Sequence, residues 1–138
     1  IKEYIPDLTI TYSDYYKDVI DGLLEKFKEA NQKYGYEVDY FRVTGSLEIV
    51  FKVASLSKTN PEYAGYVVYG CVIEGKTYHN HVIQNNVYDK LLQVSLDSMR
   101  PIGFGVLTVK TYEQALERSV GIKGRGAEAL EGLHSLLV

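Results

Sequence analysis

YVVYGCVI, residues 66–73, is an uninterrupted apolar run in a chain of 138 residues. Such a run is typical of a strand in the middle of a parallel sheet, because helices cover both faces of that strand. The polar segment EGKTYH follows it, and an amphipathic helical pattern begins at Asn80. The run therefore predicts a central parallel strand that leads through a loop into a crossover helix.

Strand and helix patterns alternate on both sides of this run. Further strands are predicted from β-prone or alternating residues at 8–13, 36–43 and 101–109. Helices are predicted from apolar residues at helical spacing at 18–34, 47–56, 80–99, 111–120 and 127–137, with 57–65 as a loop. Thr111 and Gln114 form a capping box for the fourth helix. The alternation predicts an α/β fold in which a four-stranded parallel sheet carries helices on both faces.

In an open parallel sheet, ligands bind beyond the carboxyl ends of the strands. The loops at those ends are residues 13–16, 43–48, 73–79 and 107–111. We therefore expect a functional site to be assembled from these loops.

Length and composition restrict the class of protein. We expect residues 1–138 to form one domain, since this length can bury a sizeable core. A net charge of −3 disfavours nucleic-acid binding, and a single cysteine excludes internal disulfides and multi-cysteine zinc sites. No apolar run reaches the roughly 18 residues of a membrane span, and no signal peptide is visible. We therefore expect no membrane partner and a cytoplasmic location.

GCVIEGKT, residues 70–77, matches the phosphate loop of nucleotide-hydrolysing enzymes, G-x-x-x-x-G-K-[ST]. Such a loop needs mobile backbone between its glycines, whereas residues 71–73 belong to the predicted strand. We interpret the match as coincidental. The shorter piece Gly75-Lys76-Thr77 lies between a strand end and a helix start, where backbone N–H groups favour an anion. It predicts a site for the phosphate of a small substrate.

His79 and His81 form an H-x-H pair, which could bind a metal. No further histidine or cysteine pair supports a metal site, so none is expected. His79 alone, beside the predicted phosphate site, is a better general acid or base, because imidazole titrates near neutral pH. The alternative for His79 is a helix cap or a surface residue.

Four other residues have an ordinary structural interpretation. Cys71 is expected to be a buried, unreactive thiol within the central strand. Glu48 follows the Gly45 turn and is expected to cap the second helix. Phe104 is expected in the core, and Arg118 on a solvated helix face.

Four separate blocks, VTGSLEIV (43–50), GCVIEGKTYH (70–79), FGVLTVKTYEQALERS (104–119) and GRGAEAL (124–130), resemble the lumazine synthase family. The similarity runs from about Thr9 to the end of the chain. It implies a flavodoxin-like three-layer sandwich and the penultimate reaction of riboflavin biosynthesis. In this transferase reaction, 5-amino-6-ribitylaminouracil and 3,4-dihydroxy-2-butanone 4-phosphate give 6,7-dimethyl-8-ribityllumazine, phosphate and water, without a cofactor or metal.

The resemblance also implies residue roles within one subunit. Tyr15 would stack on the pyrimidine ring, and Glu48 would accept hydrogen bonds from the ribityl hydroxyls. His79 would transfer protons. The remaining substrate-binding residues would contact the ring and ribityl chain (Ser46, Leu47, Cys71, Val72, Ile73) or the phosphate (Gly75, Lys76, Thr77).

Members of this family form pentamers, and in some cases shells of sixty subunits, which implies a homo-oligomer here and riboflavin synthase as a potential partner. Phe104, Arg118 and Arg125 would reach the site from the neighbouring subunit, where Phe104 closes the pocket and Arg118 pairs with the phosphate. Two alternatives remain at this stage. One is the archaeal type of riboflavin synthase on the same fold, and the other is a non-catalytic flavin-binding or shell-forming protein.

Overall fold

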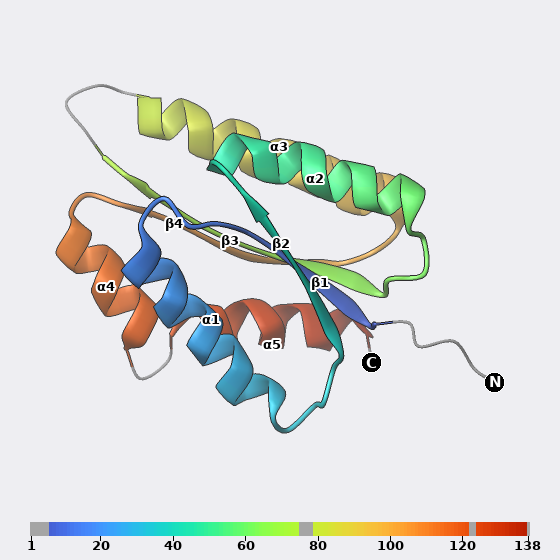
Figure 1. Cartoon of the computed structure of the whole chain (residues 1–138). Coiled ribbons are helices and arrows are strands. Elements are labelled where there is room, and N and C mark those ends of the chain that lie inside the picture. Colours follow the sequence, from blue (N-terminus) through green and yellow to red (C-terminus); the bar gives the residue numbers. More distant parts are fainter. Residues whose placement is uncertain (1–5, 75–78, 122–123, 138) are drawn as a thin grey trace.

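The computed structural model describes residues 6–74, 79–121 and 124–137, with the side chains of 79–84 excepted. Strands and helices alternate along the described chain (Figure 1). They are β1 (Leu8–Ser13), α1 (Lys17–Asn31), β2 (Val38–Val43), α2 (Ser46–Thr59), β3 (Gly65–Ile73), α3 (His79–Ser98), β4 (Ile102–Val109), α4 (Tyr112–Val120) and α5 (Arg125–Leu137).

The strands form one parallel sheet in the order β2-β1-β3-β4. β3 pairs with β1 on one side and β4 on the other, and its first seven residues are buried. The apolar run at 66–73 is thus a central strand, as predicted. Gly70 lies within the paired part of β3, opposite Val106, so the backbone between Gly70 and Ile73 cannot form a phosphate loop.

Helices cover both faces of the sheet, which gives the predicted flavodoxin-like three-layer sandwich. α1, α4 and α5 lie on one face and α2 and α3 on the other (Figure 1). Alternate strand residues supply the two cores. Ile10 and Tyr69 belong to the core under α1, α4 and α5, whereas Val68 and Val106 belong to the core under α2 and α3.

Some predicted boundaries are wrong. α1 ends at Asn31 rather than continuing towards Gly35, because the Asn31 side chain turns to the next segment. Its Nδ2 donates to the Tyr36 carbonyl at 2.9 Å, and its Oδ1 accepts from the Tyr36 N–H at 3.0 Å. α2 continues beyond residue 56 to Thr59, whose Oγ1 donates to the Ser55 carbonyl at 2.9 Å.

The predicted capping box of α4 is present in a modified form. Thr111 Oγ1 accepts from the Gln114 N–H at 3.2 Å, as predicted. Gln114 Oε1 accepts from the N–H of Lys110 at 2.9 Å, one residue before the expected partner. Both bonds satisfy N–H groups at a helix start, so the local sequence pattern correctly located this helix.

None of the helices in the described part of the chain is long and apolar enough to cross a membrane.

Candidate active site

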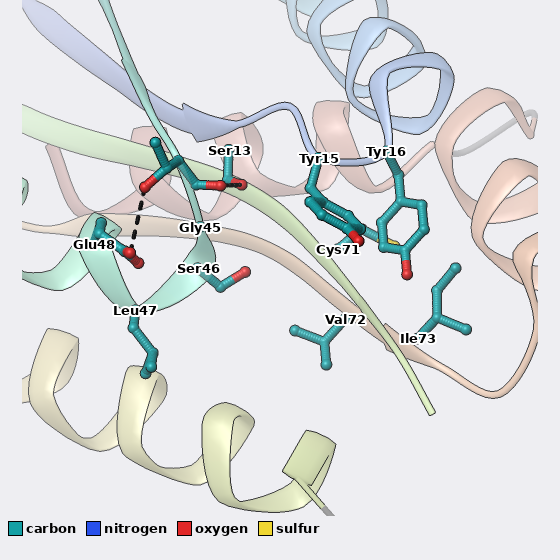
Figure 2. A pocket seen from close by; sticks show the side chains of 11 residues that line it. Ser13, Tyr15, Tyr16, Gly45, Ser46, Leu47, Glu48, Cys71, Val72 and Ile73 are labelled. Carbon is teal, nitrogen blue, oxygen red and sulfur yellow. Dashed lines mark hydrogen bonds between the residues drawn. The ribbon is translucent and has the colours of Figure 1, made fainter. Parts of the chain in front are cut away.

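The carboxyl ends of β1, β2 and β3 lie side by side and border a pocket of about 280 Å³ (Figure 2). We call it the strand-end pocket. The loops after β1 and β2, the first turn of α2 and the last residues of β3 form its lining. The predicted site residues that the fold brings together here are Tyr15, Ser46, Leu47, Glu48, Cys71, Val72 and Ile73.

The loop after β1 carries Tyr15 on one side of this pocket. Its ring is 77% exposed and packs edge-on against the ring of Tyr16, with centroids 4.9 Å apart. Arg42 of β2 holds the same loop, because its Nε donates to Asp14 Oδ1 at 2.8 Å. This hydrogen bond and the charge of Arg42 lower the pKa of Asp14, so the carboxyl stays ionised at neutral pH. An exposed aromatic face on an anchored loop can stack on a planar ring.

The first turn of α2, which follows β2, carries Glu48 at the opposite end of the pocket (Figure 2). Glu48 Oε1 accepts from Thr44 Oγ1 at 3.3 Å, and no side chain caps the start of α2. The prediction that Glu48 caps α2 is therefore wrong. Gly45 leaves space for this carboxylate, since a Cβ at Gly45 would lie 3.1 Å from Glu48 Oε2. Glu48 is exposed and can accept further hydrogen bonds from a polyhydroxylated ligand.

The end of β3 forms the floor between these two loops. Cys71 is buried, and burial raises the pKa of its thiol to about 11. The thiol is therefore neutral near pH 7, in agreement with the predicted unreactive cysteine. Val72 and Ile73 are partly buried and add apolar surface.

Arg118 and Arg125 lie elsewhere, in a second hollow of about 350 Å³ on α4, α5 and their connection. We call it the arginine hollow; its other lining residues are Glu117, Gly121, Gly124 and Glu128. Arg118 Nη1 makes one long contact, 3.5 Å, to the Thr108 carbonyl. Arg125 Nη1 lies 3.4 Å from Glu128 Oε2, and both side chains are about half exposed. Arg118 and Arg125 are both exposed, so the two guanidinium groups are accessible to an anion.

Phe104 lies on β4 and is partly buried rather than a full core residue. Its ring packs edge-on against Tyr88 of α3, with centroids 5.5 Å apart. Together with Leu92, these two rings line a small apolar hollow. Phe104, like the two arginines, is absent from the lining of the strand-end pocket.

The predicted phosphate loop, Gly75, Lys76 and Thr77, lies outside the described residues. His79 is the first residue of α3, but its side chain is also outside them. Their predicted roles therefore stay predictions. Within the part of the chain that the structure describes, no group of three or more His, Cys, Asp or Glu residues could hold a metal ion.

Sequence reasoning missed four residues of the strand-end pocket: Ser13, Tyr16, Thr44 and Gly45. All four lie in the loops 13–16 and 43–48, which were expected to border a site. Ser13 Oγ donates to the Thr44 carbonyl at 3.3 Å and so ties these two loops together. The position of the loops was the available signal, but the sequence does not distinguish their inward-facing from their outward-facing residues.

The fold and the strand-end pocket define a flavodoxin-like α/β protein with a small-molecule site beyond the carboxyl ends of its central strands. Comparison with known proteins identifies the family. The family model described as 6,7-dimethyl-8-ribityllumazine synthase matches residues 6–137. The chain therefore belongs to the 6,7-dimethyl-8-ribityllumazine synthase family.

Curated relatives carry the same name. The 6,7-dimethyl-8-ribityllumazine synthase of Corynebacterium jeikeium is 39% identical over 126 residues, which cover 88% of this chain and 76% of the relative. That of Bartonella tribocorum is 36% identical over 114 residues, which cover 83% of this chain and 76% of the relative. That of Agrobacterium fabrum is 37% identical over 117 residues, which cover 82% of this chain and 79% of the relative.

The chain is thus an enzyme of riboflavin biosynthesis, a transferase that makes 6,7-dimethyl-8-ribityllumazine. The family match and the names of these relatives do not favour the two alternatives, an archaeal-type riboflavin synthase and a non-catalytic flavin-binding protein.

Proposed function

We propose that the strand-end pocket binds 5-amino-6-ribitylaminouracil and holds it for condensation with 3,4-dihydroxy-2-butanone 4-phosphate. The observation that carries this proposal is the convergence of three predicted segments, around Tyr15, Ser46–Glu48 and Cys71–Ile73, on one pocket. These segments are far apart in the sequence, and their predicted roles all concern the same substrate. Tyr15 stacks on the pyrimidine ring, and backbone groups of 71–73 contact its polar edge.

Glu48 accepts hydrogen bonds from the ribityl hydroxyls in this proposal. Its exposed carboxylate, with one contact to Thr44, supports the role because several acceptor sites remain. Hydrogen bonds to a charged acceptor are stronger than neutral ones, typically about 1.5–3 kcal/mol. Glu48 would therefore fix which end of the substrate lies towards β2.

The phosphate of the second substrate is bound by Gly75, Lys76 and Thr77 together with Arg118 of a neighbouring subunit. Arg118 can pair with phosphate through two parallel N–H···O bonds, which fixes orientation as well as charge. Arg125 adds positive charge, and Phe104 of the same neighbour closes the pocket. The exposed guanidinium groups of the arginine hollow and its separation from the strand-end pocket support this arrangement.

A site that needs both surfaces requires a homo-oligomer with head-to-tail contacts, since one surface of each subunit meets the other surface of the next. We propose a pentameric ring, twelve of which would form a sixty-subunit shell. We also place the reaction in the cytoplasm, where the free thiol of Cys71 stays reduced.

In the reaction, the amine attacks the ketone and the adduct loses water to give an imine, phosphate is then eliminated, and ring closure releases a second water. Each step moves protons, and His79 carries them as general acid and base. Holding two reactive substrates in line contributes much of the acceleration, up to about 7–11 kcal/mol in favourable cases.

Incubation of the protein with both substrates tests the proposed function. We expect the fluorescent product 6,7-dimethyl-8-ribityllumazine to accumulate only when both substrates are present. Glu48→Gln keeps the size of the side chain and removes its charge, and should raise the KM for the pyrimidine more than the KM for the phosphorylated ketone. A chain that binds the product tightly but makes none would contradict the proposal.

A further inference from the structure

We propose that Tyr16 binds the phosphorylated ketone substrate by donating a hydrogen bond from its phenol hydroxyl, and that it helps to select this substrate. The inference rests on the proposed function, which places the pyrimidine and the ketone in the strand-end pocket. It adds a substrate contact on the β1 side of that pocket, next to Tyr15.

Contacts on two sides hold the Tyr16 ring. Tyr15 packs against it edge-on at 4.9 Å, and the Tyr112 ring of α4 lies 6.2 Å from it. Its backbone is held as well, because the Tyr16 carbonyl accepts from the Ile20 N–H at 3.1 Å in the first turn of α1. Figure 2 shows the Tyr16 hydroxyl directed towards Ile73, at the end of the pocket away from Glu48.

The hydroxyl of Tyr16 differs from those of Tyr63, Tyr69 and Tyr88. Tyr63 donates to Asp39 at 2.6 Å, Tyr69 donates to the Gly126 carbonyl at 2.6 Å, and Tyr88 donates to the Val106 carbonyl at 2.5 Å. Those hydroxyls stabilise the fold. Tyr16 is only partly buried, and its hydroxyl has no hydrogen-bond partner among the described residues. A held ring with an unused hydroxyl at a pocket wall can donate to a ligand.

Burial raises the pKa of Tyr16, and the neighbouring Tyr15 and Cys71 raise it further. The phenol therefore stays protonated at neutral pH. A neutral O–H group donates to a ketone or phosphate oxygen without charge repulsion, whereas a carboxylate such as Glu48 can only accept.

The two ends of the pocket thus differ in chemistry. The Glu48 end offers an acceptor, which suits the many hydroxyl groups of the ribityl chain. The Tyr16 end offers a donor, which suits the oxygen-rich ketone phosphate. Tyr16 also borders Ile73, after which the chain continues to the predicted phosphate-binding residues 75–77. These features assign the ketone, rather than the pyrimidine, to Tyr16.

Steady-state kinetics of Tyr16→Phe, with each substrate varied in turn, test the assignment. Loss of one neutral hydrogen bond should raise the KM for the phosphorylated ketone about 3- to 10-fold and leave the KM for the pyrimidine within about twofold. The thermal unfolding midpoint should not fall, because the hydroxyl has no hydrogen-bond partner to lose within residues 6–74, 79–121 and 124–137. Tyr112→Phe is the matched control, since that hydroxyl donates to Asp18 at 3.3 Å outside the pocket.

The assignment is overturned if Tyr16→Phe leaves the KM for the phosphorylated ketone unchanged, or if it changes only the KM for the pyrimidine. Calorimetric titration of wild type and Tyr16→Phe with the phosphorylated ketone alone gives a measure that does not depend on turnover. Weaker binding of the ketone to Tyr16→Phe than to the wild type supports the assignment. Equal binding to the two proteins, or no binding to the wild type, overturns it. A wild-type protein that binds the ketone but makes no lumazine contradicts the proposed function and leaves the Tyr16 contact standing.

Discussion

The strand-end pocket and the arginine hollow are built in different ways. The pocket is formed by loops and strand ends from three separate parts of the chain, and its lining is mainly aromatic, apolar and neutral, with Glu48 as its carboxylate. The hollow is formed by two consecutive helices and their connection, and it contains two arginines with two glutamates. One surface suits a planar ring with hydroxyl groups, and the other suits an anion.

Neither surface alone offers everything that a condensation of a pyrimidine with a phosphate ester requires. The two surfaces have separate lining residues, which agrees with the proposal that each is one half of a shared site. In the arrangement proposed above, a site is complete only when the hollow of one copy meets the pocket of the next. Four predictions test or refine this division of labour, from the largest expected effect to the smallest.

Arg118→Ala should have the largest effect on activity. Loss of a charged partner of the phosphate typically costs about 2–4 kcal/mol, which is roughly a 30- to 1000-fold fall in kcat/KM for the phosphorylated ketone. Arg118→Lys should recover only part of the lost kcat/KM, because lysine cannot form two parallel hydrogen bonds to the phosphate. Lys58→Ala, on the last turn of α2, is a control for loss of an exposed positive charge. If the kcat and KM of Arg118→Ala equal those of the wild type, the arginine hollow is not part of the active site.

Cys71 should react slowly although it borders the pocket. Burial raises the pKa of its thiol to about 11, so at pH 8 it should be alkylated about 100-fold more slowly than a free thiol of ordinary pKa. The raised pKa also means that folding favours the protonated thiol, and stability should decline as pH rises above about 9 and the unfolded thiol ionises. Mass spectrometry after timed alkylation measures the rate. Rapid modification at pH 8 would show that the pocket floor is open to solvent.

His79→Ala should lower kcat about 10- to 100-fold, near or below the low end for loss of a general acid or base, because the substrates are intrinsically reactive. The pH dependence of kcat should change in this variant, whereas it should keep its shape in Arg118→Ala. His134→Ala is a control, since that ring stacks on Tyr34 far along the chain from the pocket residues. Unchanged kcat and pH profile in His79→Ala would assign proton transfer to another group.

Mixed assemblies of His79→Ala and Arg118→Ala chains should regain activity. In an equal, random mixture, half of the pockets keep His79 and half of the neighbouring hollows keep Arg118. About a quarter of the sites should then be intact, as independent head-to-tail contacts require. Native mass spectrometry confirms mixing, and product fluorescence measures recovery. Thoroughly mixed assemblies no more active than their parents would show that both groups act within one subunit.

Local sequence patterns predicted the parts of this protein that local forces shape. The apolar run before Glu74 predicted a covered strand, and the Thr111–Gln114 pattern located α4 because capping needs residues within one helical turn. The end of α1 escaped prediction because Asn31 bonds to Tyr36 in a segment beyond the helix. Glu48 was misjudged as a helix cap for a similar reason, since the Thr44 hydroxyl is its partner.

The sequence by itself therefore determined the element order, the central place of β3 and the loops that surround a ligand, because hydrophobic periodicity and capping act over a few residues. The tertiary structure alone decided which loop residues face inward and that Phe104, Arg118 and Arg125 lie away from the pocket. It also decided that the Tyr16 hydroxyl has no hydrogen-bond partner in the described part of the chain, while the Tyr69 hydroxyl reaches the Gly126 carbonyl. Residues such as Tyr69 and Gly126 are distant in sequence, and only the packing of helices on the sheet brings them within hydrogen-bond distance.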